Sequence, residues 1–243
     1  MKWKALGLAL ALLSGGAPLA RACDGQTGAV IFQDNFADDS GGWDVETGDH
    51  PHDQIKPPDF EFTLTSDYFV DSSENMMFNA TFADYCMDFA LPAAPAPDNR
   101  ASAGIILWAT DYKNYLLAIT RTNGTVELYK KTDGNYGKVF SVVNSPAFNA
   151  SPGAVNSLRV VADADQKLTV YLNGNAVKAV RTPAPTGLLR FGMFVELTKA
   201  PPSDVVIRVK NFSVNAVASP STPTPTPVVS PSSPTRGQQS GTH

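Results

Sequence analysis

The clearest pattern in this chain lies between residues 153 and 181, where apolar and polar positions alternate with a period of two. In the segment 167–172, Leu, Val and Leu alternate with Thr and Tyr, which is typical of a strand with one buried face. Asn173 and Gly174 follow, and both residue types tolerate the positive φ that a two-residue hairpin turn requires. The segments 157–162, 167–172 and 176–181 therefore predict an antiparallel meander.

Similar segments recur along the chain, separated by turns that contain Gly, Pro or Asn. The Pro-rich stretch 92–97 predicts a loop, because proline cannot donate to a strand ladder. No helical periodicity of useful length follows residue 22. About a dozen antiparallel strands predict an all-β fold in which two sheets pack face to face. The other predicted strands are 29–36, 60–65, 76–82, 85–91, 102–109, 115–121, 125–131, 138–143, 188–197 and 204–214.

The first 22 residues have the composition of a secretory signal peptide. Lys2 and Lys4 form a basic start, residues 5–13 form an apolar run, and Ala20, Arg21 and Ala22 form a cleavage signal of the A-x-A type. The apolar run is too short to cross a bilayer, and no other stretch approaches the length that a membrane helix needs. We therefore expect a secreted, extracellular protein with no membrane span.

The last 26 residues differ from the rest in composition. Residues 218–243 are dominated by Ser, Thr and Pro, which bury little apolar area and favour extended conformations. We expect a disordered tail that acts as a linker or stalk, with a possible association with the cell envelope. The segment 23–217 is then a single β-sandwich domain, a size that one hydrophobic core can support.

The charge balance excludes one class of partner. The 243 residues include 19 Lys and Arg and 23 Asp and Glu, a net charge of −4. Cleavage after residue 22 removes three basic residues and no acidic ones, which leaves 16 against 23, or −7. An acidic surface argues against nucleic acid.

Cys23 and Cys86 are the only cysteines. In an oxidising compartment they predict one disulfide, worth roughly 4 kcal/mol for a loop of this length. A lipoprotein acylated at Cys23 is an alternative, although Arg21 fits that motif poorly. A pair of free thiols is the third possibility.

Five stretches carry a resemblance to a known family. They are VIFQDNFADDSGGW, DYCMDFALP, ASAGIILWATDYKNYLLAIT, NSLRVVADADQKLTVYLNGNAV and VVIRVKNFSV, in this order along the chain. Over about residues 29–215 the sequence resembles the concanavalin A-like lectin/glucanase superfamily, and within it the 3-keto-disaccharide hydrolase-type and laminin-G-like modules. The resemblance implies a jelly roll whose concave sheet often holds glycans.

The carboxylates of this sequence do not match the catalytic pattern of hydrolases on the fold that the resemblance implies. Family 16 glycoside hydrolases on this fold carry the motif E-x-D-x-x-E on one strand, and this sequence lacks it. Asp84 and Asp88 share a predicted strand but would lie about 13 Å apart, too far for either hydrolytic geometry. Asp163 and Asp165 fall in a predicted turn, where Asp is common for conformational reasons.

The sequence therefore predicts no catalytic residue and favours a non-catalytic module that binds a polysaccharide or glycoconjugate. A hydrolase or lyase acting on glycosidic or 3-ketosugar substrates is the first alternative. A structural or adhesive module that binds protein is the second alternative.

Two stretches contain residues able to bind metal. His50 and His52 flank Pro51 beside Asp49 and Asp53, although a solvated polar loop explains them equally simply. The family resemblance implies a structural calcium near the paired first and last strands. It places Asp34 and Asn211 there as oxygen ligands. No other cofactor is expected.

Strand alternation predicts which side chains face a ligand. In 125–131 and 188–197 the apolar positions turn inward, so the charged and aromatic positions between them turn outward. Aromatic rings beside fixed hydrogen-bonding groups suit sugars, which present apolar C–H faces and hydroxyls. An outer sheet face is also normally polar, and Trp108 can equally belong to the core. The predicted ligand-binding residues are Trp108, Arg121, Glu127, Tyr129, Arg190 and Glu196.

Overall fold

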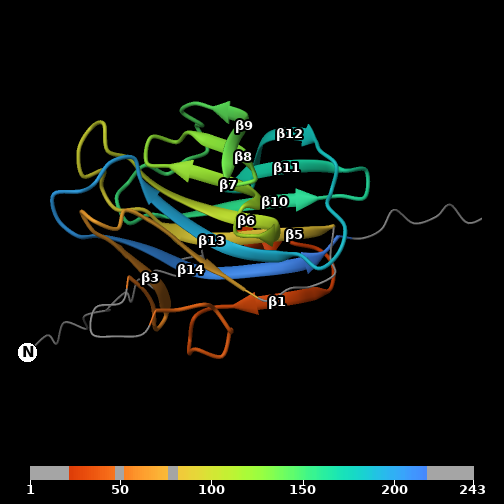
Figure 1. Cartoon of the computed structure of the whole chain (residues 1–243), viewed down its shortest axis with the longest axis horizontal. Coiled ribbons are helices and arrows are strands. Elements are labelled where there is room, and N and C mark those ends of the chain that lie inside the picture. Colours follow the sequence, from red (N-terminus) through yellow and green to blue (C-terminus); the bar gives the residue numbers. More distant parts are fainter. Residues whose placement is uncertain (1–21, 47–51, 76–81, 218–243) are drawn as a thin grey trace, which may run out of the picture.

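The computed structural model describes residues 22–46, 52–75 and 82–217. Within these ranges a short 3-10 turn, η1 (Ala22–Gly25), precedes fourteen strands, and no α-helix is found. The strands form two antiparallel sheets that pack as a sandwich (Figure 1). The predicted all-β sandwich is therefore confirmed.

The larger sheet has eight strands, and its central strand β14 (Val205–Ala216) lies beside β5 (Ala83–Ala90). The predicted meander forms one side of this sheet, with Asn173 and Gly174 at φ of 47° and 76° in its hairpin turn. In order the sheet contains β12 (Asn175–Arg181), β11 (Lys167–Leu172), β10 (Val155–Ala162), β5, β14, β3 (Asp59–Leu64) and β2 (Asp53–Lys56), while β1 (Val30–Asp34) also pairs with β14.

The smaller sheet has six strands in a nearly continuous antiparallel order. Its members are β4 (Val70–Glu74), β13 (Arg190–Leu197), β6 (Ala101–Asp111), β7 (Asn114–Arg121), β8 (Val126–Thr132) and β9 (Asn135–Val142), in that order. Consecutive hairpins join β6 to β9 (Figure 1).

Two observed strands were not expected. β2 and β4 both fall between the predicted strands, in stretches for which no strand was predicted. Each is an edge strand with few apolar residues, DQIK and VDSSE, so neither shows the alternation that marks a half-buried strand. Most of the predicted strand 76–82 lies outside the described residues.

The main core fills the space between the sheets and is rich in aromatic rings. Phe191 of the smaller sheet stacks on Phe212 of the larger sheet, with ring centroids 5.4 Å apart. Trp43 packs edge-on against both rings, and its indole Nε1 donates a 2.8 Å hydrogen bond to Oδ2 of Asp34. The partner oxygen lets the indole be buried without an unsatisfied donor.

A second apolar cluster covers the outer face of the smaller sheet. It consists of Ile106, Ala109, Tyr115, Leu117, Ile119 and Phe194, with Tyr129 packed against it. The central strands β6 and β7 are therefore buried on both faces. This double burial explains why their sequences read as nearly continuous apolar runs.

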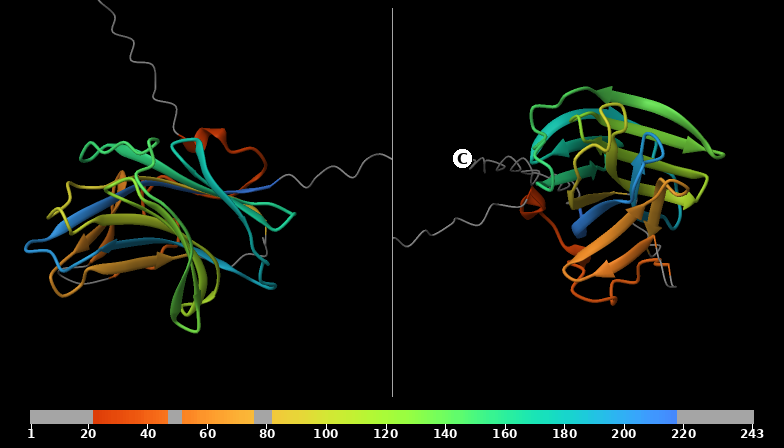
Figure 2. Two further views of the ribbon diagram at one scale, coloured as in Figure 1. Left: turned by 90° about the horizontal axis from the view of Figure 1, so that it is seen from above. Right: turned by 90° about the vertical axis from the view of Figure 1, so that its left-hand side faces the viewer.

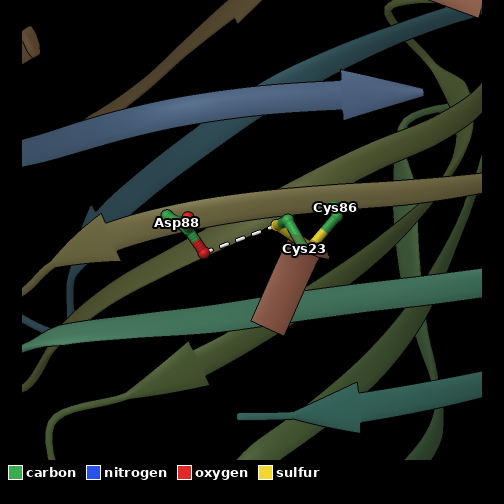
Figure 3. Close-up of side chains that lie close together, drawn as sticks. All are labelled: Cys23, Cys86 and Asp88. Atoms are coloured by element: carbon green, nitrogen blue, oxygen red, sulfur yellow. Dashed lines mark hydrogen bonds between the residues drawn. A yellow bond between two sulfur atoms is a disulfide. The ribbon is translucent and has the colours of Figure 1, made fainter. Parts of the chain in front are cut away.

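Cys23 and Cys86 form a disulfide with an S–S distance of 2.00 Å, as predicted. The bond holds η1 on the outer face of the larger sheet (Figure 3). Oδ1 of Asp88 lies 3.4 Å from the Cys23 sulfur, a contact without a hydrogen bond because a disulfide sulfur carries no proton. A pair of free thiols is excluded in this structure, and a sulfur in a disulfide cannot also carry a thioether-linked lipid.

Candidate functional site

A row of polar side chains crosses three strands on the outer face of the smaller sheet. The strand register places Ser102 of β6 opposite both Glu196 of β13 and Arg121 of β7. Arg121 Nη1 lies 2.7 Å from Glu196 Oε1 and donates a 3.1 Å hydrogen bond to the Ser102 hydroxyl. Directly opposed residues of an antiparallel pair share a face, so the register alone brings this row together.

Arg121 also binds Glu127 of β8. Its Nε donates a 2.8 Å hydrogen bond to Glu127 Oε2, and Lys138 Nζ of β9 approaches Oε1 to 2.7 Å. Burial acts to raise the pKa of Glu127, but the hydrogen bonds from Lys138 and Arg121 outweigh it and lower the pKa to about 2. Glu127 is therefore a fixed anion at neutral pH.

Beside this charged group lies a hollow with an apolar floor. Its volume is about 280 Å³, close to the lower limit of the 300–1,000 Å³ that ligand pockets occupy. Tyr129 is half-buried at its side, with Lys138 Nζ 5.5 Å from the centre of its ring. The hollow is lined by Val70, Leu117, Ile119, Arg121, Tyr129, Tyr136, Phe194 and Glu196.

A second polar group on the same face borders the hollow at Tyr136. The hydroxyls of Tyr115 and Tyr136 are 2.6 Å apart, and Lys131 Nζ lies within 5.0 Å of the centres of both rings. Arg190 is exposed and lies 3.7 Å from Glu74. Burial raises the pKa of the Glu74 carboxyl, and the charge on Arg190 opposes this shift.

Four of the six predicted ligand-binding residues thus come together at one end of the face: Arg121, Glu127, Tyr129 and Glu196. Arg190 shares the face but lies six positions from Glu196 along β13, about 20 Å away. The role of these five residues in binding a ligand stays a prediction.

Trp108 does not join this face, contrary to the strand alternation. Trp108 is 3% exposed and belongs to the main core. Trp108 has a φ of 56°, and the β6–β7 register shifts between Leu107 and Asp111. This irregularity puts Leu107 and Trp108 on the inner side in succession, because an extra residue in a strand reverses the alternation beyond it.

The predicted calcium ligands do not face one another. Asp34 is paired with Phe212, whose ring lies in the main core, whereas the neighbouring Asn211 points to the outer face of the larger sheet. Asp34 instead accepts hydrogen bonds from the Phe36 amide and the Trp43 indole. Asn211 Nδ2 donates to Asp88 Oδ2 at 2.9 Å. The two side chains lie on opposite faces of one sheet, so they cannot share an ion in this conformation.

The other acidic candidates have structural partners. Asp84 forms two hydrogen bonds with the Arg159 guanidinium, of 2.8 and 2.6 Å. Asp163 Oδ1 accepts from the Asp165 and Lys167 amides, as expected for a turn residue. His52 stacks on Tyr68, while His50 lies outside the described residues.

Several residues of the face were not predicted from the sequence. Lys138 sits on β9, where five of the eight residues are exposed in succession and no alternation is visible. Ile119, Leu117 and Phe194 look like ordinary core positions, since a strand buried on both faces has no polar side. The nearly continuous apolar sequences of β6 and β7 were the one signal that could have indicated a second apolar layer.

Comparisons with known proteins bear on the fold. No protein-family model matches the sequence, and no curated protein matches it significantly. Solved structures do match. A β-glucanase from Bacillus licheniformis is 12% identical with a TM-score of 0.56, covering 79% of this chain and 100% of its own.

Two further matches are carbohydrate-binding proteins by their descriptions. The carbohydrate-binding module CBM66 from Bacillus subtilis is 13% identical with a TM-score of 0.53, and the match covers 72% of this chain and 96% of the module. The potassium-bound carbohydrate recognition domain of Emp46p is 12% identical with a TM-score of 0.55, covering 72% and 89%. At this identity the likeness concerns the fold.

The chain therefore has the concanavalin A-like jelly-roll fold that its sequence resembles. The disulfide fits an extracellular protein. Within the three described ranges no helix has the length and apolar character needed to cross a bilayer.

Proposed function

We propose that this protein is a secreted glycan-binding module without catalytic activity, and that the outer face of the smaller sheet is its binding surface. The observation that carries the proposal is the position of the Tyr129 ring, which borders an apolar hollow beside the fixed Arg121–Glu196 pair. The carbohydrate-binding module and the lectin domain of the same fold add support.

The chemistry of this surface suits a sugar. A pyranose ring presents a C–H face that packs on an aromatic or aliphatic surface, here Tyr129 and the apolar floor. Its hydroxyls require donors and acceptors at fixed positions. Glu196 and Arg121 are held by one another, so they present hydrogen-bonding groups without first having to be ordered.

Binding is favoured over hydrolysis by the protonation states on this face. A glycosidase needs one carboxylic acid whose raised pKa keeps it protonated, opposite a second, ionised carboxylate. Glu127 has a pKa of about 2, and Glu196 is ion-paired with Arg121. A carboxyl with so low a pKa as that of Glu127 is not suited to donate a proton at neutral pH.

One observation favours the hydrolase as the second candidate. Glu74 lies on the same face, and burial raises its pKa, as a general acid requires. The hydrolase reading therefore assigns Glu74 as the acid, and the Glu74→Gln variant tests it directly.

The remaining parts of the proposal come from the two ends of the chain. Residues 1–22 direct the protein to secretion, and residues 218–243 form the stalk that holds the domain at the cell envelope. N-terminal sequencing of the secreted protein tests the first point, because the mature chain should begin at Cys23.

The experiment is a glycan array followed by calorimetric titration of the best oligosaccharide, with a reducing-end assay on the same samples. Tyr129→Ala should weaken binding by roughly 1 to 3 kcal/mol, because the ring supplies a stacking surface. Tyr112→Ala is the matched control, since Tyr112 is 68% exposed and lies outside the hollow. Equal affinities for wild type and Tyr129→Ala would refute the proposed surface.

The reducing-end assay separates the two candidate functions. New reducing ends in wild type that disappear in Glu74→Gln would establish the hydrolase. An absence of binding to any glycan would leave a protein-binding adhesive module as the better reading.

A further inference from the structure

The edges of the two sheets each bring one carboxylate into the space between them. Asp53 of β2 is paired with Phe62, and Asp71 of β4 is paired with Val195. Both partners belong to the main core, and directly opposed residues point to the same face. Asp53 and Asp71 therefore point inward. Their strands, β2 and β4, are edge strands of the two sheets and are coloured orange in Figure 2.

Both carboxylates are buried, with exposures of 4% and 6%. Oδ1 of Asp71 accepts hydrogen bonds from the Ser72 amide at 2.7 Å and the Tyr68 hydroxyl at 3.2 Å. Within the described ranges, Oδ2 of Asp71 is buried and has no hydrogen-bond partner. A buried carboxylate oxygen without a hydrogen bond lowers the free energy of unfolding. A ligand bound to this atom would remove that penalty.

The two charges are not compensated by an ion pair in the part of the chain that the structure describes. Among the described residues, neither Asp53 nor Asp71 takes part in an ion pair. Asp53 Oδ1 accepts a 2.6 Å hydrogen bond from the Glu46 amide, which brings another carboxylate close.

The neighbourhood is negative throughout. Burial raises the pKa of Asp53, and the charges of Glu46 and Asp44 add to this rise. Burial and then the charge of Asp53 raise the pKa of Asp71 to about 6. Of the other titratable groups nearby, Tyr68 is held neutral by its raised pKa, and the His52 ring is stacked on Tyr68 with Nδ1 3.2 Å from the Thr63 carbonyl oxygen.

We propose that Asp53 and Asp71 bind a divalent cation of the calcium type between the two sheets, with Oδ2 of Asp71 as a direct ligand. The available donors are hard oxygen atoms, which calcium prefers. This site is independent of the proposed glycan surface, which lies on the outer face of the smaller sheet.

The geometry also sets the strength of the site. Three metal-ligating side chains converge within 4.8 Å at one place in the described ranges, at Cys23, Cys86 and Asp88, and the two sulfurs there are joined in the disulfide. The site at Asp53 and Asp71 therefore has two carboxylate ligands, with water in the remaining positions. Calcium sites with few charged ligands in extracellular modules have Kd values of about 10⁻⁴ to 10⁻³ M, and we place this site in that range.

Binding at this position links the edge of one sheet to the edge of the other. A cation that binds only the folded state raises its stability by RT ln(1 + c/Kd), where c is the concentration of the free cation. The test is thermal unfolding at pH 7.5 of protein stripped with EDTA, in 10 mM CaCl₂, in 10 mM MgCl₂ and in NaCl of equal ionic strength. For a Kd near 1 mM, calcium should raise the Tm by about 3 to 6 °C over the NaCl sample, and magnesium should act less.

Two variants localise the effect. Asp71→Asn and Asp53→Asn should both lose the response to calcium, and each should be at least as stable as wild type without calcium, because one of two repelling charges is gone. Asp165→Asn is the matched control, since Asp165 is exposed in the turn between β10 and β11, and it should respond like wild type.

A calorimetric titration of wild type with CaCl₂ should show one site. The proposal is overturned if calcium leaves the Tm of wild type unchanged, or if both Asn variants keep the wild-type response. Should Asp71→Asn not fold, Asp53→Asn and the titration decide the question.

Discussion

The guanidinium Nε of Arg121 donates a hydrogen bond of 2.8 Å to Oε2 of Glu127, with side-chain exposures of 13% and 6%. Neighbouring strands supply the two residues, and the four-residue β7–β8 connection (122–125) brings them onto one face. A charge pair this deeply buried is held by its geometry, because either partner alone would be a buried charge without compensation.

The first prediction concerns removal of the cation. Arg121→Leu leaves Glu127 and Glu196 on the same face with Lys138 as the remaining cation, so unfolding free energy should fall by roughly 3 kcal/mol. Urea unfolding followed by fluorescence measures it. Arg100→Leu is the control because Arg100 is exposed, and its value should stay within about 0.5 kcal/mol of wild type. Similar losses in both variants would contradict the prediction.

The second prediction concerns pH. The folded pKa of Glu127, about 2, lies below its ordinary value of 4.5, so the ionised form favours folding. Its contribution, on the order of 3 kcal/mol, is complete above about pH 5 and is lost as the pH falls toward 2. The difference in stability between wild type and Glu127→Gln should therefore shrink over this range. A difference that is constant from pH 7 to pH 3 would show that the ion pairs do not lower this pKa.

The third prediction concerns the disulfide. Cys86→Ser should lower the Tm by roughly 10 °C, because the bond closes a loop across 63 positions of sequence. The double variant with Cys23→Ser should unfold at the same temperature, since both changes remove one bond. A thiol assay on the mature protein should detect no free cysteine. Intact mass that includes a diacylglyceryl group would instead establish the lipoprotein.

The fourth prediction separates a core ring from a surface ring. Trp108→Ala should cost about 3 to 5 kcal/mol of folding stability, because its ring fills the main core. Tyr129→Ala should cost about 1 kcal/mol, since Tyr129 is half-buried and packs against the smaller cluster. Chemical unfolding of both variants tests the contrast. Comparable losses would mean that Tyr129 supports the fold as much as Trp108 does.

Much of the fold could be predicted because long strands with one buried face show a regular alternation of apolar and polar residues in the sequence. The segment 167–172 was placed correctly to the residue. The strands β2 and β4 could not be found this way, because each pairs on one side only and is mostly polar. The proposed cation site lies between these two strands. The sequence indicated Asp53 as one of several residues able to bind metal beside His52, but nothing in it indicated Asp71.

The candidate site was predictable in part for the same reason. Glu127 and Glu196 follow the regular alternation of their strands, and the structure places both on the outer face. The direction of the Trp108 side chain is set by a local irregularity of β6. This irregularity depends on backbone conformation rather than on residue type. Asp34 pairs with Phe212, the neighbour of Asn211, so the side chains of Asp34 and Asn211 point to opposite faces of the sheet. The sequence alone does not show whether Asn211 or Phe212 faces the core.

The second apolar layer over β6 and β7 has a consequence for how a ligand is received. Strands that are buried on both faces and paired on both edges open rarely, so their amides should exchange with solvent more slowly than those of the edge strands β4 and β9. The floor of the hollow is then as rigid as the interior of the protein. A ligand therefore binds to a preformed surface. The conformational entropy lost on association is that of the ligand and of the side chains around the rim.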